Sequence, residues 1–145
     1  MTITTRTNLN LRVVANSERL FADLSEKAAR SICTFLIAYQ GKKSKEMADC
    51  FSSKGILSLR GDQTWMGRRV ISTRLRDMFT NEPVTSRKFE IREVYLSKEK
   101  VIIELAADLT IQHDGQRTIL YLCVFKLSDD SLLIDQCRFY TSSRQ

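Results

Sequence analysis

Three segments in the C-terminal half of the chain are too apolar for strands with one solvated face. The stretch 119–127 is apolar at every position except Lys126, and the stretches 101–109 and 132–140 alternate only in part. Successive side chains of a strand point to opposite faces, so a strand with one wet face alternates apolar and polar residues. We therefore expect a sheet covered on one face by the helices of this chain and on the other by a second protein chain.

The N-terminal half has helical spacing instead. Asn16 or Ser17 can cap a helix whose apolar residues recur with helical period as far as Tyr39, and Gly41 is suited to end it. Together with two shorter periodic stretches, this pattern predicts three helices, over 17–39, 44–51 and 68–79.

The remaining periodic stretches predict strands, over 56–60, 64–66, 87–96, 101–111, 116–127 and 132–141. Short connections favour antiparallel pairing, and the turn Gly61-Asp62 is typical of a hairpin. The expected fold class is α+β, a curved antiparallel sheet wrapped around three helices. We expect one domain over 17–145 and a flexible arm over 1–16, in which Leu9, Leu11 and Val13 alternate as in a short strand.

Composition narrows the class of protein without naming a function. A chain of 145 residues with 43% apolar and 28% charged residues is typical of one soluble domain. No apolar run reaches the ~18 residues that cross a bilayer, and the N-terminus does not resemble a signal peptide. We expect an intracellular protein without a membrane segment.

The cysteines do not indicate a metal site or a disulfide framework. Cys33, Cys50, Cys123 and Cys137 are scattered, and His113 is the only histidine. We expect four buried thiols, and neither a metal nor a cofactor.

The order of elements, with a hairpin that leads through an aromatic-x-Gly motif into a helix, resembles the nuclear transport factor 2-like superfamily over about residues 18–141. The residues that carry the resemblance are Met47–Phe51, Leu57–Gly67, Val70, Ile71, Leu75 and Asp135–Phe139. The resemblance implies a cone-shaped fold, and the superfamily includes both enzymes and protein-binding modules.

The enzyme branch resembles ketosteroid isomerase and the polyketide cyclases. The position of its base carboxylate corresponds here to Leu59 or Arg60, and that of its long-helix tyrosine lies near Phe35. We therefore expect no catalytic residue and no enzyme activity. The residues that remain as possible catalytic groups are Asp62, Asp108, Asp135, His113 and Tyr39.

In the transport branch, the chain is most similar to the small export protein related to nuclear transport factor 2. That family pairs with a similar domain of an mRNA export receptor through the outer sheet face, and the position of Arg138 there contacts an aspartate of the partner. The alternative is an internal pair of Arg138 with Glu104 or Asp108. The partner-binding residues implied are Arg138, Gln136, Tyr140, Tyr121 and Cys123.

The charge pattern argues against a Ran carrier. The acidic positions of that family correspond to Arg60, Gln112 and Asp114, so one of them carries the opposite charge. The net charge is +6, from 23 basic and 17 acidic residues. The basic cluster on the third helix, Arg68, Arg69, Arg74 and Arg76, suits a solvated face or, together with Lys42, Lys43 and Lys45 in the turn before the second helix, a weak, salt-dependent contact with RNA.

The leading hypothesis from sequence is a non-enzymatic subunit that heterodimerises with an mRNA export receptor and moves between nucleus and cytoplasm. The alternatives are a homodimeric enzyme of the isomerase or cyclase kind, and a homodimeric scaffold that binds peptides containing phenylalanine.

Overall fold

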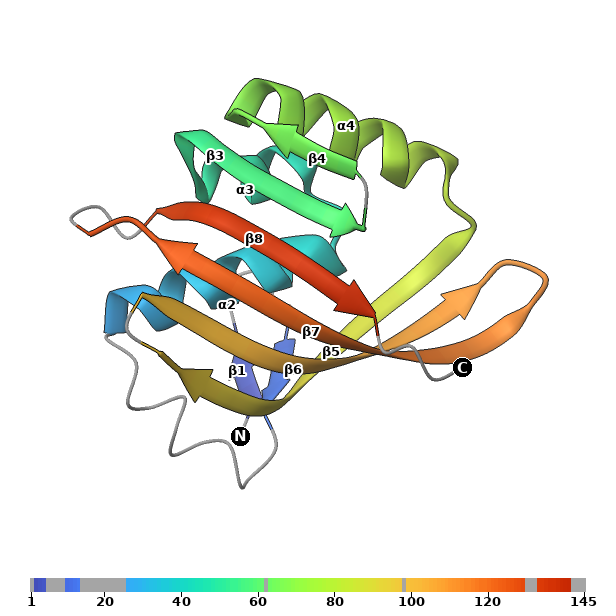
Figure 1. Cartoon of the computed structure of the whole chain (residues 1–145). Coiled ribbons are helices and arrows are strands. Elements are labelled where there is room, and N and C mark those ends of the chain that lie inside the picture. Colours follow the sequence, from blue (N-terminus) through green and yellow to red (C-terminus); the bar gives the residue numbers. More distant parts are fainter. Residues whose placement is uncertain are drawn as a thin grey trace.

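A computed structural model describes residues 2–4, 10–13, 26–61, 63–97, 99–129 and 133–141. Figure 1 shows strands lying side by side across the front of the molecule, with helix α2 behind them and helix α4 along one edge. The helices are α2 (Glu26–Gln40), α3 (Ser44–Asp49) and α4 (Arg68–Asn81). The strands are β1 (Thr2–Thr4), β2 (Asn10–Val13), β3 (Phe51–Arg60), β4 (Gln63–Met66), β5 (Val84–Leu96), β6 (Lys100–Ile111), β7 (Gly115–Leu127) and β8 (Ile134–Thr141).

The strands form one sheet in the order β1-β2-β5-β6-β7-β8-β3-β4. The predicted α+β class and the curved sheet around helices are confirmed, but the sheet is mixed and not antiparallel throughout. Strand β3 pairs with β8 in parallel, and β2 pairs with β5 in parallel. The prediction of antiparallel pairing rested on short connections, and these join β5, β6, β7 and β8. A long stretch of chain separates β3 from β8, so these two strands can run in parallel.

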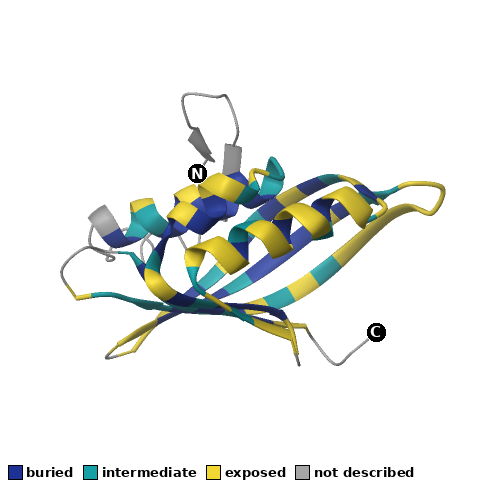
Figure 2. Ribbon diagram, turned by 90° about the horizontal axis from the view of Figure 1, so that it is seen from above, coloured by how far each residue is buried: buried dark blue, intermediate teal, exposed yellow. Residues whose placement is uncertain are grey.

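The described helices cover the inner face of the sheet (Figure 2). Phe35 of α2 lies at the centre of the core, fully buried, with its ring edge-on to those of Phe51 and Phe125 at centroid distances of 5.6 and 5.9 Å. Its ring also lies 6.3 Å from that of Phe139 on β8. Aromatic packing between α2, β3, β7 and β8 therefore holds the long helix against the sheet.

Two glycines fix the entry to α4. Gly67 has a φ of 91°, which side chains with a Cβ rarely adopt, and its N–H donates to the carbonyl oxygen of Gly55 at 2.8 Å. A Cβ on Gly55 would lie 2.9 Å from the Cβ of Phe51. The aromatic-x-Gly motif thus has a local cause, because β4 must turn sharply into α4 beside the bulged start of β3.

Most element boundaries agree with the pattern of the sequence, with three differences. β3 starts at Phe51 instead of Ile56, and β5 starts at Val84. Within the predicted arm, β1 and β2 are strands, and the mobility of the arm stays a prediction. The predicted cap at Asn16 or Ser17 lies outside the described residues. No helix in the described ranges is long and apolar enough to cross a membrane.

We predict that Phe35→Ala lowers the free energy of unfolding by about 3 to 5 kcal/mol, because it leaves a cavity among aromatic rings. Urea denaturation followed by circular dichroism measures the change. Thr34→Ala, at an exposed position of the same helix, is the control and should change stability by at most about 0.5 kcal/mol. A cost below about 1 kcal/mol for Phe35→Ala would show that the core does not depend on this ring.

Candidate functional site

A cleft of about 420 Å³ opens between the β3–β4 hairpin and the C-terminal half of α4. We call it the cone-mouth cleft. Its walls combine apolar, basic, acidic and amide side chains, from Leu59, Arg60, Gln63, Trp65, Arg74, Asp77, Met78, Asn81, Glu82 and Pro83. Trp65 is half-buried and packs against the core, as expected, while the neighbouring Met66 is exposed. The size and mixed lining are those of a site for a small organic molecule.

A buried ion pair connects this cleft to the interior. Arg87 on β5 donates from both terminal nitrogens to the two carboxylate oxygens of Glu82, at 3.1 and 2.9 Å. The side chains are only 7% and 9% exposed. The Lys42 ammonium lies 3.7 Å from Oε1 of Glu82 and donates to the carbonyl oxygen of Val84. Glu82 is therefore fully engaged in a structural pair that fixes the end of α4 to the start of β5.

Aromatic rings surround the Arg87 guanidinium. Its central carbon lies 4.6 Å from the ring centroid of Tyr39 and 5.8 Å from that of Phe79. Burial opposes the charged form of Arg87, but the hydrogen bond to Glu82 and nearby negative charge give a net rise of its pKa. Arg87 is therefore a permanent cation with ring faces on one side and a carboxylate on the other.

Two phenols lie beside this pair. Burial raises the pKa of the Tyr39 phenol above its usual range, against the effect of the Arg87 charge. Burial also raises the pKa of the half-buried Tyr121 phenol, while the charges of Arg87 and Arg60 act in the opposite direction. Both phenols are protonated at neutral pH and suited to donate a hydrogen bond. Arg60 also lines the cone-mouth cleft, whereas Tyr121 is not part of the lining and packs against Phe139 in the interior.

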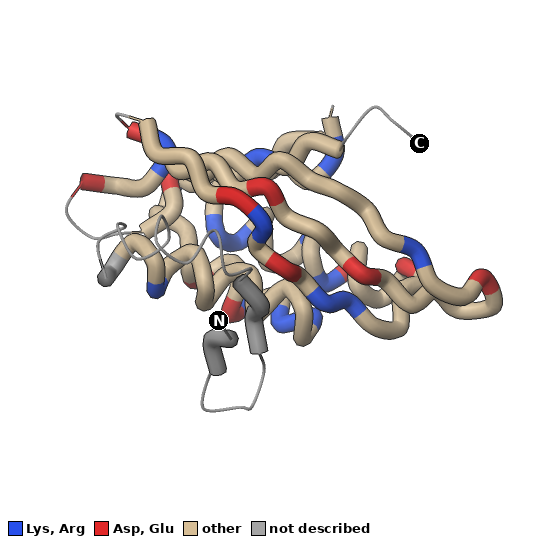
Figure 3. The backbone as a smooth tube through the Cα atoms, turned by 90° about the horizontal axis from the view of Figure 1, so that it is seen from below, with Lys and Arg blue, Asp and Glu red and all other residues tan. Residues whose placement is uncertain are grey.

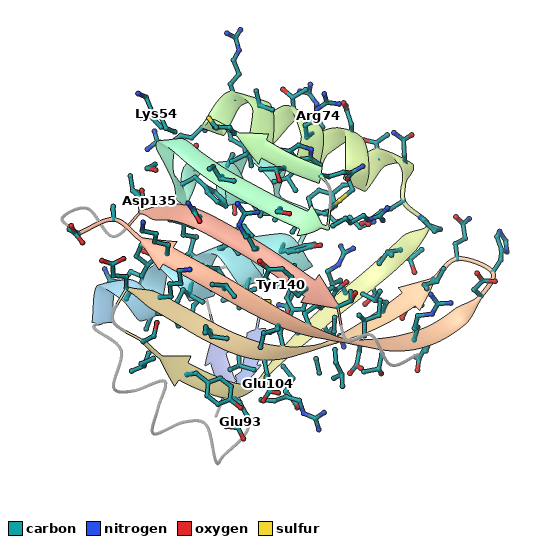
Figure 4. The ribbon with its side chains drawn as sticks, viewed as in Figure 1. Lys54, Arg74, Glu93, Glu104, Asp135 and Tyr140 are labelled. Carbon is teal, nitrogen blue, oxygen red and sulfur yellow. The ribbon has the colours of Figure 1, made fainter. Side chains whose placement is uncertain are left out.

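The outer face of the sheet brings together three of the five predicted partner-binding residues. Val124 on β7 is the cross-strand neighbour of Arg138 on β8, Leu122 that of Tyr140, and Lys126 that of Gln136. Tyr140, Leu122 and Leu120 are exposed large apolar residues on this face. Figure 4 labels Tyr140 and Glu104, both on the side of the sheet turned to the viewer.

The assignment of Tyr121 and Cys123 to this face was wrong. Cys123 is opposite Phe139 and fully buried, and the ring of Tyr121 packs edge-on against that of Phe139 at 5.4 Å. Both point inward, because the register pairs even-numbered β7 residues with Arg138 and Tyr140. A shift of one residue moves a side chain to the opposite face.

The predicted internal alternative for Arg138 is not found. Glu104 accepts a hydrogen bond from the Tyr95 hydroxyl at 3.1 Å, and Asp108 accepts one from Thr118 at 2.7 Å. Among the residues that the structure describes, no ion pair joins Arg138 to either acid. Figure 3 shows acidic and basic residues interspersed on the β5–β6 side, where Arg92 contacts Glu90 at 3.7 Å.

The other possible catalytic groups lie apart from one another. His113 is exposed in the β6–β7 turn with a φ of 69°, and Asp135 is half-buried on β8. Asp62 lies outside the described residues. All four cysteines are buried and unpaired. No group of three potential metal ligands is placed for an ion within the described ranges.

The predicted basic cluster divides between two grooves. Arg68 and Arg69 line a groove of about 340 Å³ between α3 and α4, together with Lys45 and Asp49, while Arg74 belongs to the cone-mouth cleft. Arg68 also donates to the carbonyl oxygen of Phe51. The RNA contact stays a prediction.

The sequence reasoning missed the Glu82–Arg87 pair. A signal was present, because Arg87 has the same parity as Phe89 and Ile91, whose side chains face the core. An arginine at an inward position of a strand requires a buried partner. Glu82 is the nearest acid before Arg87 in the chain, and the Pro83 that follows it is typical of a helix end.

Solved structures with the same fold come from both isomerase-like and hydrolase-like proteins. A protein with a ketosteroid isomerase-like fold from Catenulispora acidiphila DSM 44928, in complex with trimethylamine, is 16% identical at a TM-score of 0.66 and covers 78% of this chain and 85% of its own. An LEH-like epoxide hydrolase from M. tuberculosis is 22% identical at a TM-score of 0.64, and the match covers 80% of this chain and 83% of the hydrolase. A SnoaL-like, polyketide cyclase-type protein from Shewanella denitrificans OS-217 is 11% identical at a TM-score of 0.67, and the match covers 81% of this chain and 91% of that protein.

These likenesses show the fold. The chain has the cone-shaped nuclear transport factor 2-like fold, as the sequence motifs implied. Neither a protein-family model nor a curated protein matches the chain. The structures named above give no support to the narrower likeness to the mRNA export protein.

We predict that Glu82→Gln lowers the free energy of unfolding by about 3 to 5 kcal/mol, because it leaves the Arg87 charge buried without its partner. The double variant Glu82→Gln/Arg87→Met should be less destabilised than the single one, because it removes the buried charge as well. Urea denaturation measures both. Asp49→Asn, which breaks the exposed Lys45–Asp49 pair, is the control and should cost at most about 0.5 kcal/mol. Equal costs for Asp49→Asn and Glu82→Gln would contradict the structural role of the buried pair.

Proposed function

We propose that the chain is a small homodimeric protein of the isomerase or cyclase kind, which binds an organic molecule in the cone-mouth cleft. The cleft itself carries this proposal. It combines the apolar surfaces of Leu59, Trp65 and Met78 with several polar side chains in a volume suited to a small molecule. Structures with the same fold include an epoxide hydrolase, a polyketide cyclase-type protein and a complex with trimethylamine, which supports a small-molecule ligand.

Turnover needs a proton donor or acceptor next to the ligand. Within the described part of the chain, Tyr121 is a candidate donor, because it is a protonated phenol whose pKa responds to the charge of Arg60, a residue of the cleft. Glu82 is a poor base, since both of its oxygens accept hydrogen bonds from Arg87. Binding is therefore the first property to test, and the sequence-based expectation of no enzyme activity stays a prediction.

We predict that a cyclic organic ligand changes the emission of Trp65 in a saturable way. Trp65 is the only tryptophan, so it reports on the cleft directly. Asn81→Tyr, which adds bulk to the cleft, should abolish the change. The control is Thr80→Tyr on the same helix. Both wild-type side chains donate to a backbone carbonyl four residues earlier, so both variants lose a similar hydrogen bond.

Cyclic ketones, lactones, epoxides and acids form the test panel, with excitation at a wavelength that excludes tyrosine. Product analysis of the same samples by mass spectrometry tests turnover. If no compound changes the Trp65 emission, or if Asn81→Tyr and Thr80→Tyr respond alike, the cleft is not the binding site.

The outer sheet face favours a second property, pairing with another chain. Leu120, Leu122 and Tyr140 are 46%, 39% and 49% exposed, and Arg138 lies beside them. Apolar side chains gathered on one face are typical of a protein interface. A second copy of this chain is the partner that fits the proposed function. The second candidate partner is the domain of an mRNA export receptor, in which case the chain would move between nucleus and cytoplasm. This candidate rests on the outward position of Arg138.

We predict that light scattering gives twice the monomer mass for the wild-type chain and the monomer mass for Leu122→Glu. The new charge would be buried against an apolar partner surface without compensation. Val70→Glu is the control, because Val70 is similarly exposed but lies on α4. If the wild-type chain is a monomer and forms a one-to-one complex with an export receptor domain, the homodimer proposal is wrong and the export-subunit hypothesis takes its place. A dimer that survives Leu122→Glu would place the interface elsewhere.

A further inference from the structure

Two arginines face the cone-mouth cleft from opposite walls. Arg60 lies at the end of β3, and Arg74, which Figure 4 labels, lies in the middle of α4. Both side chains are exposed, and neither forms a hydrogen bond or ion pair with another described residue. The two guanidinium groups therefore have donors available for a ligand.

The acids of the cleft do not neutralise this charge. Glu82 is paired with Arg87 and also lies near Lys42, so these three residues together are positively charged. Asp77 is left as the single acid that lines the cleft and makes no such pair within the described residues. Positive charge thus exceeds negative charge around the opening, which favours an anionic ligand.

The rest of the lining indicates what carries the anionic group. Leu59 is buried, Trp65 and Met78 are half-buried and packed against the core, and all three line the same cleft as the two arginines, so the cleft has an apolar wall. A bare inorganic anion would leave this wall without a contact. A molecule with a cyclic apolar body and an acidic group would use both parts of the cleft.

We propose that the ligand of the cone-mouth cleft is an organic carboxylate, held by Arg60 and Arg74 and packed against Trp65. The inference rests on the proposed function and names its ligand class. Guanidinium groups match the geometry of a carboxylate and form stronger hydrogen bonds with it than with a neutral oxygen.

Three probes with the same carbon skeleton test the charge preference. They are cyclohexanecarboxylate, cyclohexylmethanol and cyclohexylmethylammonium, which do not absorb where tryptophan is excited. Titration at constant ionic strength, read by Trp65 emission, should give the tightest binding for the carboxylate. Arg60→Gln and Arg74→Gln should each weaken carboxylate binding by about tenfold, the value for one lost charged hydrogen bond, and leave the alcohol unchanged. Arg76→Gln, an exposed arginine of α4 outside the cleft, should change neither.

The outcomes separate this inference from the proposed function. If the alcohol or the ammonium ion binds as tightly as the carboxylate, the anion preference is wrong and the cleft remains a binding site. The same holds if Arg60→Gln and Arg74→Gln behave like Arg76→Gln. If inorganic phosphate competes as well as the carboxylate, the apolar wall plays no part and the inference fails. If none of the three probes binds, the inference fails, and the wider panel decides the proposed function.

Discussion

The buried ion pair between Glu82 and Arg87 is the interaction on which the open end of the cone depends. It fixes the last turn of α4 to the first residues of β5, and the guanidinium group lies over the ring of Tyr39 on α2. The helix α2, which is distant in the chain, therefore meets the connection between α4 and β5 at these two side chains. The same pair occupies the one carboxylate at the inner wall of the cleft, so that positive charge prevails at the opening.

The features that the sequence predicted well are those with a local cause. The apolar spacing up to Tyr39 and Gly41 places α2, and the positive φ of Gly67 explains the aromatic-x-Gly motif before α4. The parallel pairing of β3 with β8 was not predictable from local patterns, because it joins segments about 80 residues apart. The candidate site was predicted less well than the fold. None of the predicted partner-binding residues lines the cone-mouth cleft, and the buried Arg87 beside it was missed.

The outer face shows how a small error changes a functional hypothesis. The outward position of Arg138 was implied by the resemblance to the export protein, and Gln136 and Tyr140 lie with it on the outer face. Tyr121 was assigned to that face without the β7–β8 register, and it instead belongs to the interior, beside Arg87. This correction moves a phenol from the presumed partner surface to the core. The proposed partner surface on the outer face and the cone-mouth cleft are therefore separate parts of the molecule, and each proposal has its own test.

The central claim is that a ligand occupies the cone-mouth cleft, and nuclear magnetic resonance tests it most directly. Cyclohexanecarboxylate is titrated into the ¹⁵N-labelled chain, and the backbone amides and the Trp65 indole N–H are followed. The account predicts shift changes that gather at Leu59, Trp65 and the residues of α4 from Arg74 onward, with little change at Leu122 or Tyr140. Changes confined to the outer sheet face, or spread without relation to the cleft, would contradict it.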